Sequence, residues 1–95
     1  MDIQSVLYGF MDRLGDDHRI GPTHISLFLA ILYFYRKQEY QVPIYVYRKE
    51  LMKQAKISAV GTYHKGMREL KLYGYIGYVP SYNPALGSLV YLLEL

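Results

Sequence analysis

The stretch "RKELMKQAKISAVGTYHKGMRELKLYGYI", Arg48 to Ile76, decides how the rest of the chain is interpreted. It predicts a short helix over 48–56, a tight connection "ISA", and a second helix that ends before Gly74. We expect Ser58 to be the N-cap of the second helix. The apolar spacing i, i+3, i+7, i+10 predicts a buried side on that helix, with Gly66 beside it: Val60, Tyr63, Met67 and Leu70. The opposite side carries Gly61, Thr62, Lys65, Arg68 and Glu69.

Two glycines inside this helix need an explanation, because each costs about 0.5–1 kcal/mol relative to alanine. Gly66 lies on the inward side, where it would let a neighbouring helix pack closely. Gly61 lies on the outward side near the helix start. It either permits close approach to a ligand or belongs to an irregular first turn, since helix starts tolerate glycine.

The flanking sequence predicts an α+β, mostly helical chain. Residues 1–19 form an amphipathic helix, capped by Asp2 and stopped at Gly15, plus a linker; its apolar stripe is Ile3, Val6, Leu7, Phe10, Met11 and Leu14. This stripe either folds back on its own chain or pairs with a second copy. A long apolar helix over 22–38 follows, then an edge strand over 42–47. "YIGYVP" and "LVYLLEL" predict a β-hairpin.

Composition and charge narrow the function classes. Of the 95 residues 52% are hydrophobic and none is cysteine, which predicts one core and suits a reducing cytoplasm. The longest apolar run is too short for a membrane span, which needs about 20 residues. Between Tyr47 and Tyr73 the chain holds seven bases and two acids, whereas the remainder holds four bases and six acids. One basic region of this kind attracts a polyanion.

From residue 20 onward the order helix, strand, short helix, turn, helix and hairpin resembles the winged helix–turn–helix family of DNA-binding domains. The segment "GTYHKGMRELKLYGYIGYVPSYNPALGSLVYL" is also similar to small winged-helix proteins of Bacteroides-type bacteria, several of which sit on mobile elements. The resemblance implies a three-helix core plus a β-hairpin wing over 20–95, with an extra N-terminal helix. It implies sequence-specific binding of double-stranded DNA by a small transcriptional regulator or mobile-element accessory factor, located in the cytoplasm and on the nucleoid.

In that family the second helix of the motif enters the major groove, so we expect its outward side to read DNA. Thr62, Lys65 and Arg68 are the best candidates for base or phosphate contacts. His64 either reaches DNA from the flank or is an exposed neutral histidine. Glu69 is expected to pair with Lys65 on the helix surface or to accept from cytosine.

The remaining candidates are phosphate contacts. They are Ser58 in the turn, Gly61 as a point of close approach, Arg48, Lys49 and Lys53 on the short helix, and, less favoured, Thr23 and His24. The expected wing tip has no lysine or arginine, and only Tyr82, Asn83 and Ser88 could contact DNA there. Tyr47 occupies the position where the family has a capping serine or threonine. Most other tyrosines are expected in core or half-buried strand positions: Tyr33, Tyr35, Tyr45, Tyr63, Tyr75, Tyr78 and Tyr91.

We expect no enzyme, cofactor or metal site. The three histidines lack metal-ligand spacing, and the chain has no phosphate-binding glycine loop. Because a single winged helix makes few base contacts, we expect a homodimer formed through the N-terminal and long helices. The alternative is a winged-helix protein–protein interaction module without DNA binding, because fold does not fix function.

Overall fold

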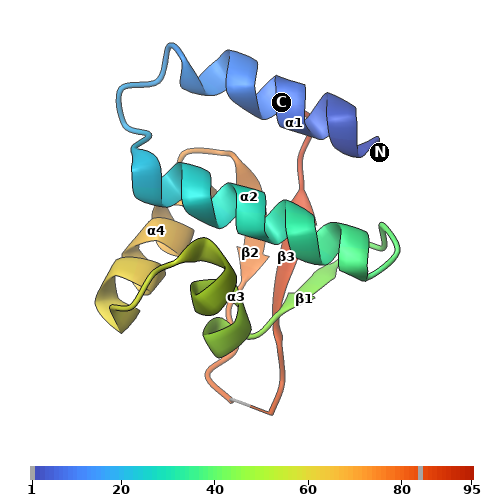
Figure 1. Cartoon of the computed structure of the whole chain (residues 1–95), viewed down its shortest axis with the longest axis vertical. Coiled ribbons are helices and arrows are strands. Elements are labelled where there is room, and N and C mark those ends of the chain that lie inside the picture. Colours follow the sequence, from blue (N-terminus) through green and yellow to red (C-terminus); the bar gives the residue numbers. More distant parts are fainter. Residues whose placement is uncertain (1, 84) are drawn as a thin grey trace.

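The computed structural model describes residues 2–83 and 85–95, and in this part of the chain four helices and three strands form an α+β fold (Figure 1). Their order is α1 (Ile3–Leu14), α2 (Pro22–Lys37), β1 (Ile44–Val46), α3 (Arg48–Ala55), α4 (Val60–Leu72), β2 (Ile76–Val79) and β3 (Ser88–Leu92). The predicted order of elements is confirmed. The strand predicted over 42–47 is shorter, because residues 42 and 43 precede the ladder.

Helix α1 packs on its own chain through its apolar stripe. This is the first of the two predicted alternatives, in which the stripe folds back on its own chain. Asp2 caps the helix by accepting a hydrogen bond from the backbone N–H of Ser5 at 3.2 Å. Phe10 is fully buried and stacks on Phe28 of α2, with 3.9 Å between ring centroids. Met11 is 49% exposed, so its predicted place in the buried stripe is wrong. The stripe is therefore one residue narrower than its spacing indicates.

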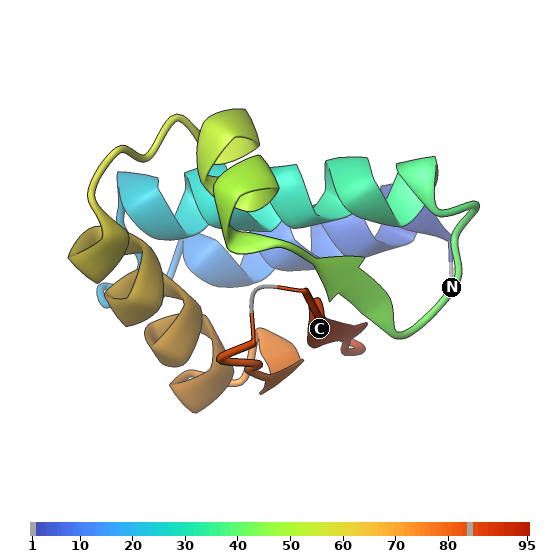
Figure 2. The same cartoon turned by 90° about the horizontal axis from the view of Figure 1, so that it is seen from below.

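Helix α2 runs through the middle of the molecule, antiparallel to α1, as Figures 1 and 2 show. It packs against α3, α4 and β1, which explains why its middle is apolar on nearly every side. Its buried residues are His24, Leu27, Phe28, Ala30, Ile31, Leu32 and Tyr35. Tyr33 is 39% exposed instead of packed as predicted, because it lies one helical turn after Leu29 on the side of α2 that is exposed; Leu29 itself is 46% exposed.

The three strands form an antiparallel sheet in the order β1-β3-β2, so β1 is an edge strand as predicted. Val90 of β3 is opposite Ile44 on one side and Tyr78 on the other, and all three side chains are buried. Side chains alternate between the two faces of a sheet. Tyr45 therefore faces outward and is 52% exposed, so its predicted packing is wrong.

The C-terminal end of α4 is fixed by backbone geometry and by α1. Gly74 has a φ of +81°, the left-handed conformation predicted for it after the helix. The Arg13 guanidinium of α1 donates hydrogen bonds to the carbonyls of Tyr73 and Gly74, at 2.6 and 2.9 Å. Helix α4 is thereby held at its end by an element far away in sequence.

Candidate nucleic-acid interface

The connection between α3 and α4 is built without the predicted serine cap. Helix α4 begins after Ala59, whose extended backbone makes it the N-cap and whose side chain cannot accept a hydrogen bond. Ser58 is exposed one position too early, so its predicted capping role is wrong. Tyr47 is the N-cap of α3 and likewise makes no side-chain cap bond, as predicted. The first N–H groups of both helices therefore lack a side-chain cap.

The inward side of α4 is anchored on α2. Tyr63, Gly66, Met67 and Leu70 are buried, as the spacing predicts, but Val60 is 43% exposed. The predicted burial of Val60 is wrong, because this residue lies in the first turn of α4, before the helix reaches the core. A Cβ added at Gly66 would lie only 2.5 Å from Cδ1 of Leu27, which confirms that this glycine allows close helix packing.

The outward side of α4 is exposed and mostly basic. The predicted site residues on it are all exposed: Gly61, Thr62, His64, Lys65 and Arg68. A Cβ added at Gly61 would meet no atom within 4 Å, so the protein itself gives no packing reason for this glycine. Lys65 and Arg68 share a shallow hollow with Glu69, Lys71 and Leu72, the last of which is 75% exposed. Lys71 was not predicted as a site residue, although it follows Arg68 by one helical turn.

The remaining basic candidates surround this face. Arg48, Lys49 and Lys53 on α3 are exposed, as is Ser58 in the turn. Within residues 2–83 and 85–95, neither Lys65 nor Arg68 makes a hydrogen bond or close ion pair. Their charges are therefore available to an external anion.

Glu69 does not form the predicted surface pair with Lys65. Its carboxylate contacts His24 Nε2 at 3.0 Å and accepts a hydrogen bond from the Tyr73 hydroxyl at 3.2 Å. The hydrogen bond with His24 is the main cause that lowers the pKa of Glu69. The carboxylate is thereby held at the start of α2, although Glu69 still lines the hollow that contains Lys65 and Arg68.

His24 is consequently not a phosphate contact, and that prediction is wrong. It is only 8% exposed, and its Nδ1 accepts a hydrogen bond from the backbone N–H of Gly21 at 3.0 Å. Because Nδ1 accepts, Nε2 carries the proton and donates to Glu69. Neighbouring Thr23 is half-buried, with its methyl group close to Gly66.

The β2–β3 loop presents Tyr82, which is 89% exposed, and Asn83, which is also exposed. The Asn83 side chain already accepts a hydrogen bond from the backbone N–H of Ala85 at 3.0 Å. Ser88, predicted as a further contact, is 8% exposed, and its hydroxyl accepts a hydrogen bond from the backbone N–H of Ser81. Ser88 therefore shapes the loop and does not face a ligand.

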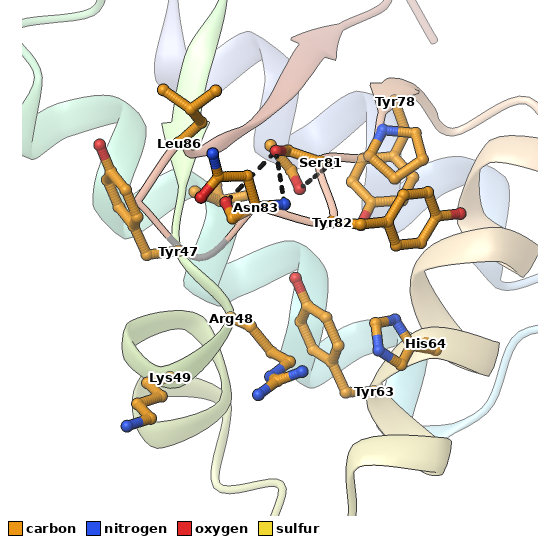
Figure 3. Close-up of a pocket in the computed structure, with 13 residues that line it drawn as sticks. Tyr47, Arg48, Lys49, Tyr63, His64, Tyr78, Ser81, Tyr82, Asn83 and Leu86 are labelled. Atoms are coloured by element: carbon orange, nitrogen blue, oxygen red, sulfur yellow. Dashed lines mark hydrogen bonds between the residues drawn. The ribbon is translucent and has the colours of Figure 1, made fainter.

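The start of α3, the flank of α4 and the β2–β3 loop enclose a pocket of about 340 Å³ (Figure 3). Arg48, Lys49 and His64 line it from the helices, and Tyr82 and Asn83 line it from the loop. The structure thus brings five predicted site residues to one cavity, whereas Lys65 and Arg68 lie on the neighbouring hollow.

Two tyrosines predicted only as core residues also line the pocket. The Tyr78 hydroxyl lies close enough to Tyr63 to affect the pKa of the Tyr63 hydroxyl. Burial is the main cause that raises the pKa of Tyr63. No sequence signal pointed to this pair, because its members come from a helix and a strand that only the fold brings together.

Comparison with protein-family models, with curated proteins and with solved structures finds no match for this chain. In the described residues, no helix combines the length and apolar character that a membrane crossing needs.

Proposed function

We propose that the chain is a winged helix–turn–helix domain that binds double-stranded DNA sequence-specifically, as a small transcriptional regulator or mobile-element accessory factor. The observation that carries the proposal is the two-sided character of α4. Tyr63, Met67 and Leu70 anchor one side in the core, while Lys65 and Arg68 lie exposed on the other, without a hydrogen bond or close ion pair in the described residues.

The order of elements supports the proposal. Helices α2, α3 and α4 pack together, β1 lies between α2 and α3 in sequence, and β2 and β3 form a hairpin directly after α4. In the proposed assignment α4 is the recognition helix and the β2–β3 hairpin is the wing. The major groove is about 12 Å wide and admits one helix.

The proposed division of labour follows from side-chain chemistry. Lys65 and Arg68 donate to guanine edges or nearby phosphates, and the Thr62 hydroxyl serves either partner. The bases of α3 and the Ser58 hydroxyl contact phosphates, which position the domain without reading sequence. Gly61 leaves room for the DNA at the first turn of α4. Tyr82 rests on the sugar–phosphate backbone, and the wing adds little charge attraction.

A homodimer completes this proposal, since one recognition helix reads few bases. Exposed apolar side chains on α1 and α2 support a contact there: Tyr8, Met11, Leu29 and Tyr33 are each 39–59% exposed. Light scattering across a concentration series is expected to show a dimer. A monomer at every concentration contradicts the proposed dimer. The proposal is then that a single domain binds DNA.

The proposal is tested by fluorescence anisotropy with mixed-sequence duplex DNA over a salt series. The five bases proposed to contact DNA, three on α3 and Lys65 and Arg68 on α4, predict that log K falls with log salt with a slope of about −4.5. Lys65→Glu combined with Arg68→Glu is expected to abolish binding.

The matched control is Arg36→Glu with Lys37→Glu, which makes the same change in net charge at exposed residues at the end of α2. It is expected to retain most of the affinity. If both double variants lose the same DNA affinity, the interaction depends only on net charge and not on the outward side of α4. Weak binding with no salt slope favours the alternative, a protein–protein interaction module.

A further inference from the structure

The pocket between α3, α4 and the β2–β3 loop has the character of a small-molecule site. Its volume of about 340 Å³ is at the lower end of the range for ligand pockets, roughly 300–1,000 Å³. Tyr47, Tyr82, Pro80 and Leu86 provide flat or apolar walls. A ligand of one ring fits a cavity of this size and lining.

The charged side chains that line the pocket are basic. Its thirteen lining residues, all within the described part of the chain, include Arg48, Lys49 and His64 but no aspartate or glutamate. In Figure 3 the Tyr63 hydroxyl points toward the loop, and the Arg48 guanidinium lies beside the Tyr63 ring. Arg48 lies near enough to Tyr63 to oppose the rise in the pKa of that hydroxyl. This charge balance favours an anion.

The buried tyrosine pair adds a directed donor. Tyr63 is 1% exposed and Tyr78 is 8% exposed. Each hydroxyl carries one proton that it can donate, and the two side chains lie close together. The pair therefore offers at least one O–H group to an acceptor in the pocket.

We infer that this pocket binds a small aromatic anion, a single ring that bears a carboxylate or a phosphate. The ring lies against Tyr47, Tyr82 and Leu86. The anionic group accepts hydrogen bonds from Arg48 and from the tyrosine pair. A sugar–phosphate unit of bound DNA shares the anionic chemistry, so the protein is first tested without DNA.

The direct test is calorimetric or NMR titration of the DNA-free protein with phenyl phosphate. A dissociation constant on the order of 1 mM or tighter is expected for a ligand of this size. Benzyl alcohol and inorganic phosphate, which each supply half of the chemistry, are expected to bind at least tenfold more weakly. If either binds as well as phenyl phosphate, the site is only an apolar hollow or only a cationic patch, and the inference is overturned.

The variant Tyr63→Phe with Tyr78→Phe removes both hydroxyls and keeps both buried rings, so it is expected to fold with nearly unchanged stability. Its affinity for phenyl phosphate is expected to fall about five- to tenfold. Arg48→Gln is expected to lower that affinity at least tenfold. The matched control is Tyr45→Phe, which removes an exposed hydroxyl outside the pocket. Full affinity in the double phenylalanine variant contradicts the role of the pair.

A regulatory consequence rests on the proposed function. Because the pocket borders the DNA-facing side of α3 and α4, saturating phenyl phosphate is expected to release duplex DNA from the wild type. The double phenylalanine variant is expected to bind DNA normally but to require a higher ligand concentration for release. Ligand binding without any DNA binding refutes the proposed function and leaves the pocket assignment intact. If saturating phenyl phosphate leaves DNA binding unchanged, the proposed competition between the ligand and DNA is overturned.

Discussion

The two glycines of α4 lead to opposite predictions for the same substitution in the same helix. A Cβ at Gly66 would lie 2.5 Å from Cδ1 of Leu27 and 3.4 Å from Cγ2 of Thr23. Leu27 is fully buried and cannot move aside without disturbing the core. Overpacking of this kind costs about 1–3 kcal/mol, and alanine returns about 0.5–1 kcal/mol in helix propensity. We therefore expect Gly66→Ala to destabilise the protein by about 1–2 kcal/mol.

The assay is thermal unfolding monitored by circular dichroism, with urea unfolding as a second measure. For a domain of this size, 1 kcal/mol corresponds to a shift of about 4–8 °C, so Gly66→Ala is expected to lower Tm by about 5–15 °C. Gly61→Ala is the matched control, because its Cβ would have no neighbour within 4 Å. It is expected to raise Tm by a few degrees. A Tm for Gly66→Ala at or above the wild-type value would refute the close packing of α4 on α2.

Gly61→Ala also separates the two roles open to this glycine. If α4 enters the major groove with its first turn close to DNA, the stabilised variant loses duplex affinity, because its methyl group occupies the space of closest approach. Unchanged affinity assigns Gly61 to the helix start alone. The measurement compares duplex anisotropy of the variant with that of the wild type at the same salt concentration.

Three further substitutions test contacts that hold the domain together. Ala59→Ser supplies the side-chain cap that α4 lacks, and urea unfolding is expected to show about 1 kcal/mol of added stability; no gain contradicts the assigned helix start. Arg13→Leu removes two hydrogen bonds to the carbonyls after α4 and is expected to cost about 1–2 kcal/mol in the same assay, whereas wild-type stability contradicts that clamp. Hydrogen bonds from Arg19, and then from Tyr75, hold the pKa of Asp17 well below its usual value. The stability that these hydrogen bonds contribute is present above the ordinary aspartate pKa of about 4 and is lost as pH falls below it. Asp17→Asn is therefore expected to lower the urea midpoint at pH 7 and to approach the wild-type midpoint near pH 2. A difference in midpoint that does not change with pH contradicts this role of Asp17.

Features set by neighbouring residues could be predicted from the sequence. The 3.6-residue period placed Tyr63, Met67 and Leu70 in the core, and the position of Gly66 among them predicted close packing on another helix. Gly74 followed the last apolar position and adopts the expected left-handed conformation. Such signals depend on residue spacing along one element, so they can be interpreted without knowledge of the fold.

Features that join distant segments could not be predicted. His24 and Glu69 are 45 positions apart, and the sequence offered Glu69 a nearer partner in Lys65. The tyrosine pair likewise joins α4 to β2, so its members looked like ordinary core residues. The prediction that Ser58 caps α4 was wrong for a different reason. A helix start is fixed by the backbone of the preceding turn, and a shift of one residue makes Ala59 the N-cap.

The central claim is that the outward side of α4 lies against DNA. It is tested most directly by NMR titration of the labelled protein with a short mixed-sequence duplex at low salt. The account predicts that amide shifts change most at residues 61–68 and at the start of α3, while the buried turn around Leu32 stays unchanged. Changes confined to the exposed side chains of α1 and α2, or no changes at saturating duplex, would contradict it.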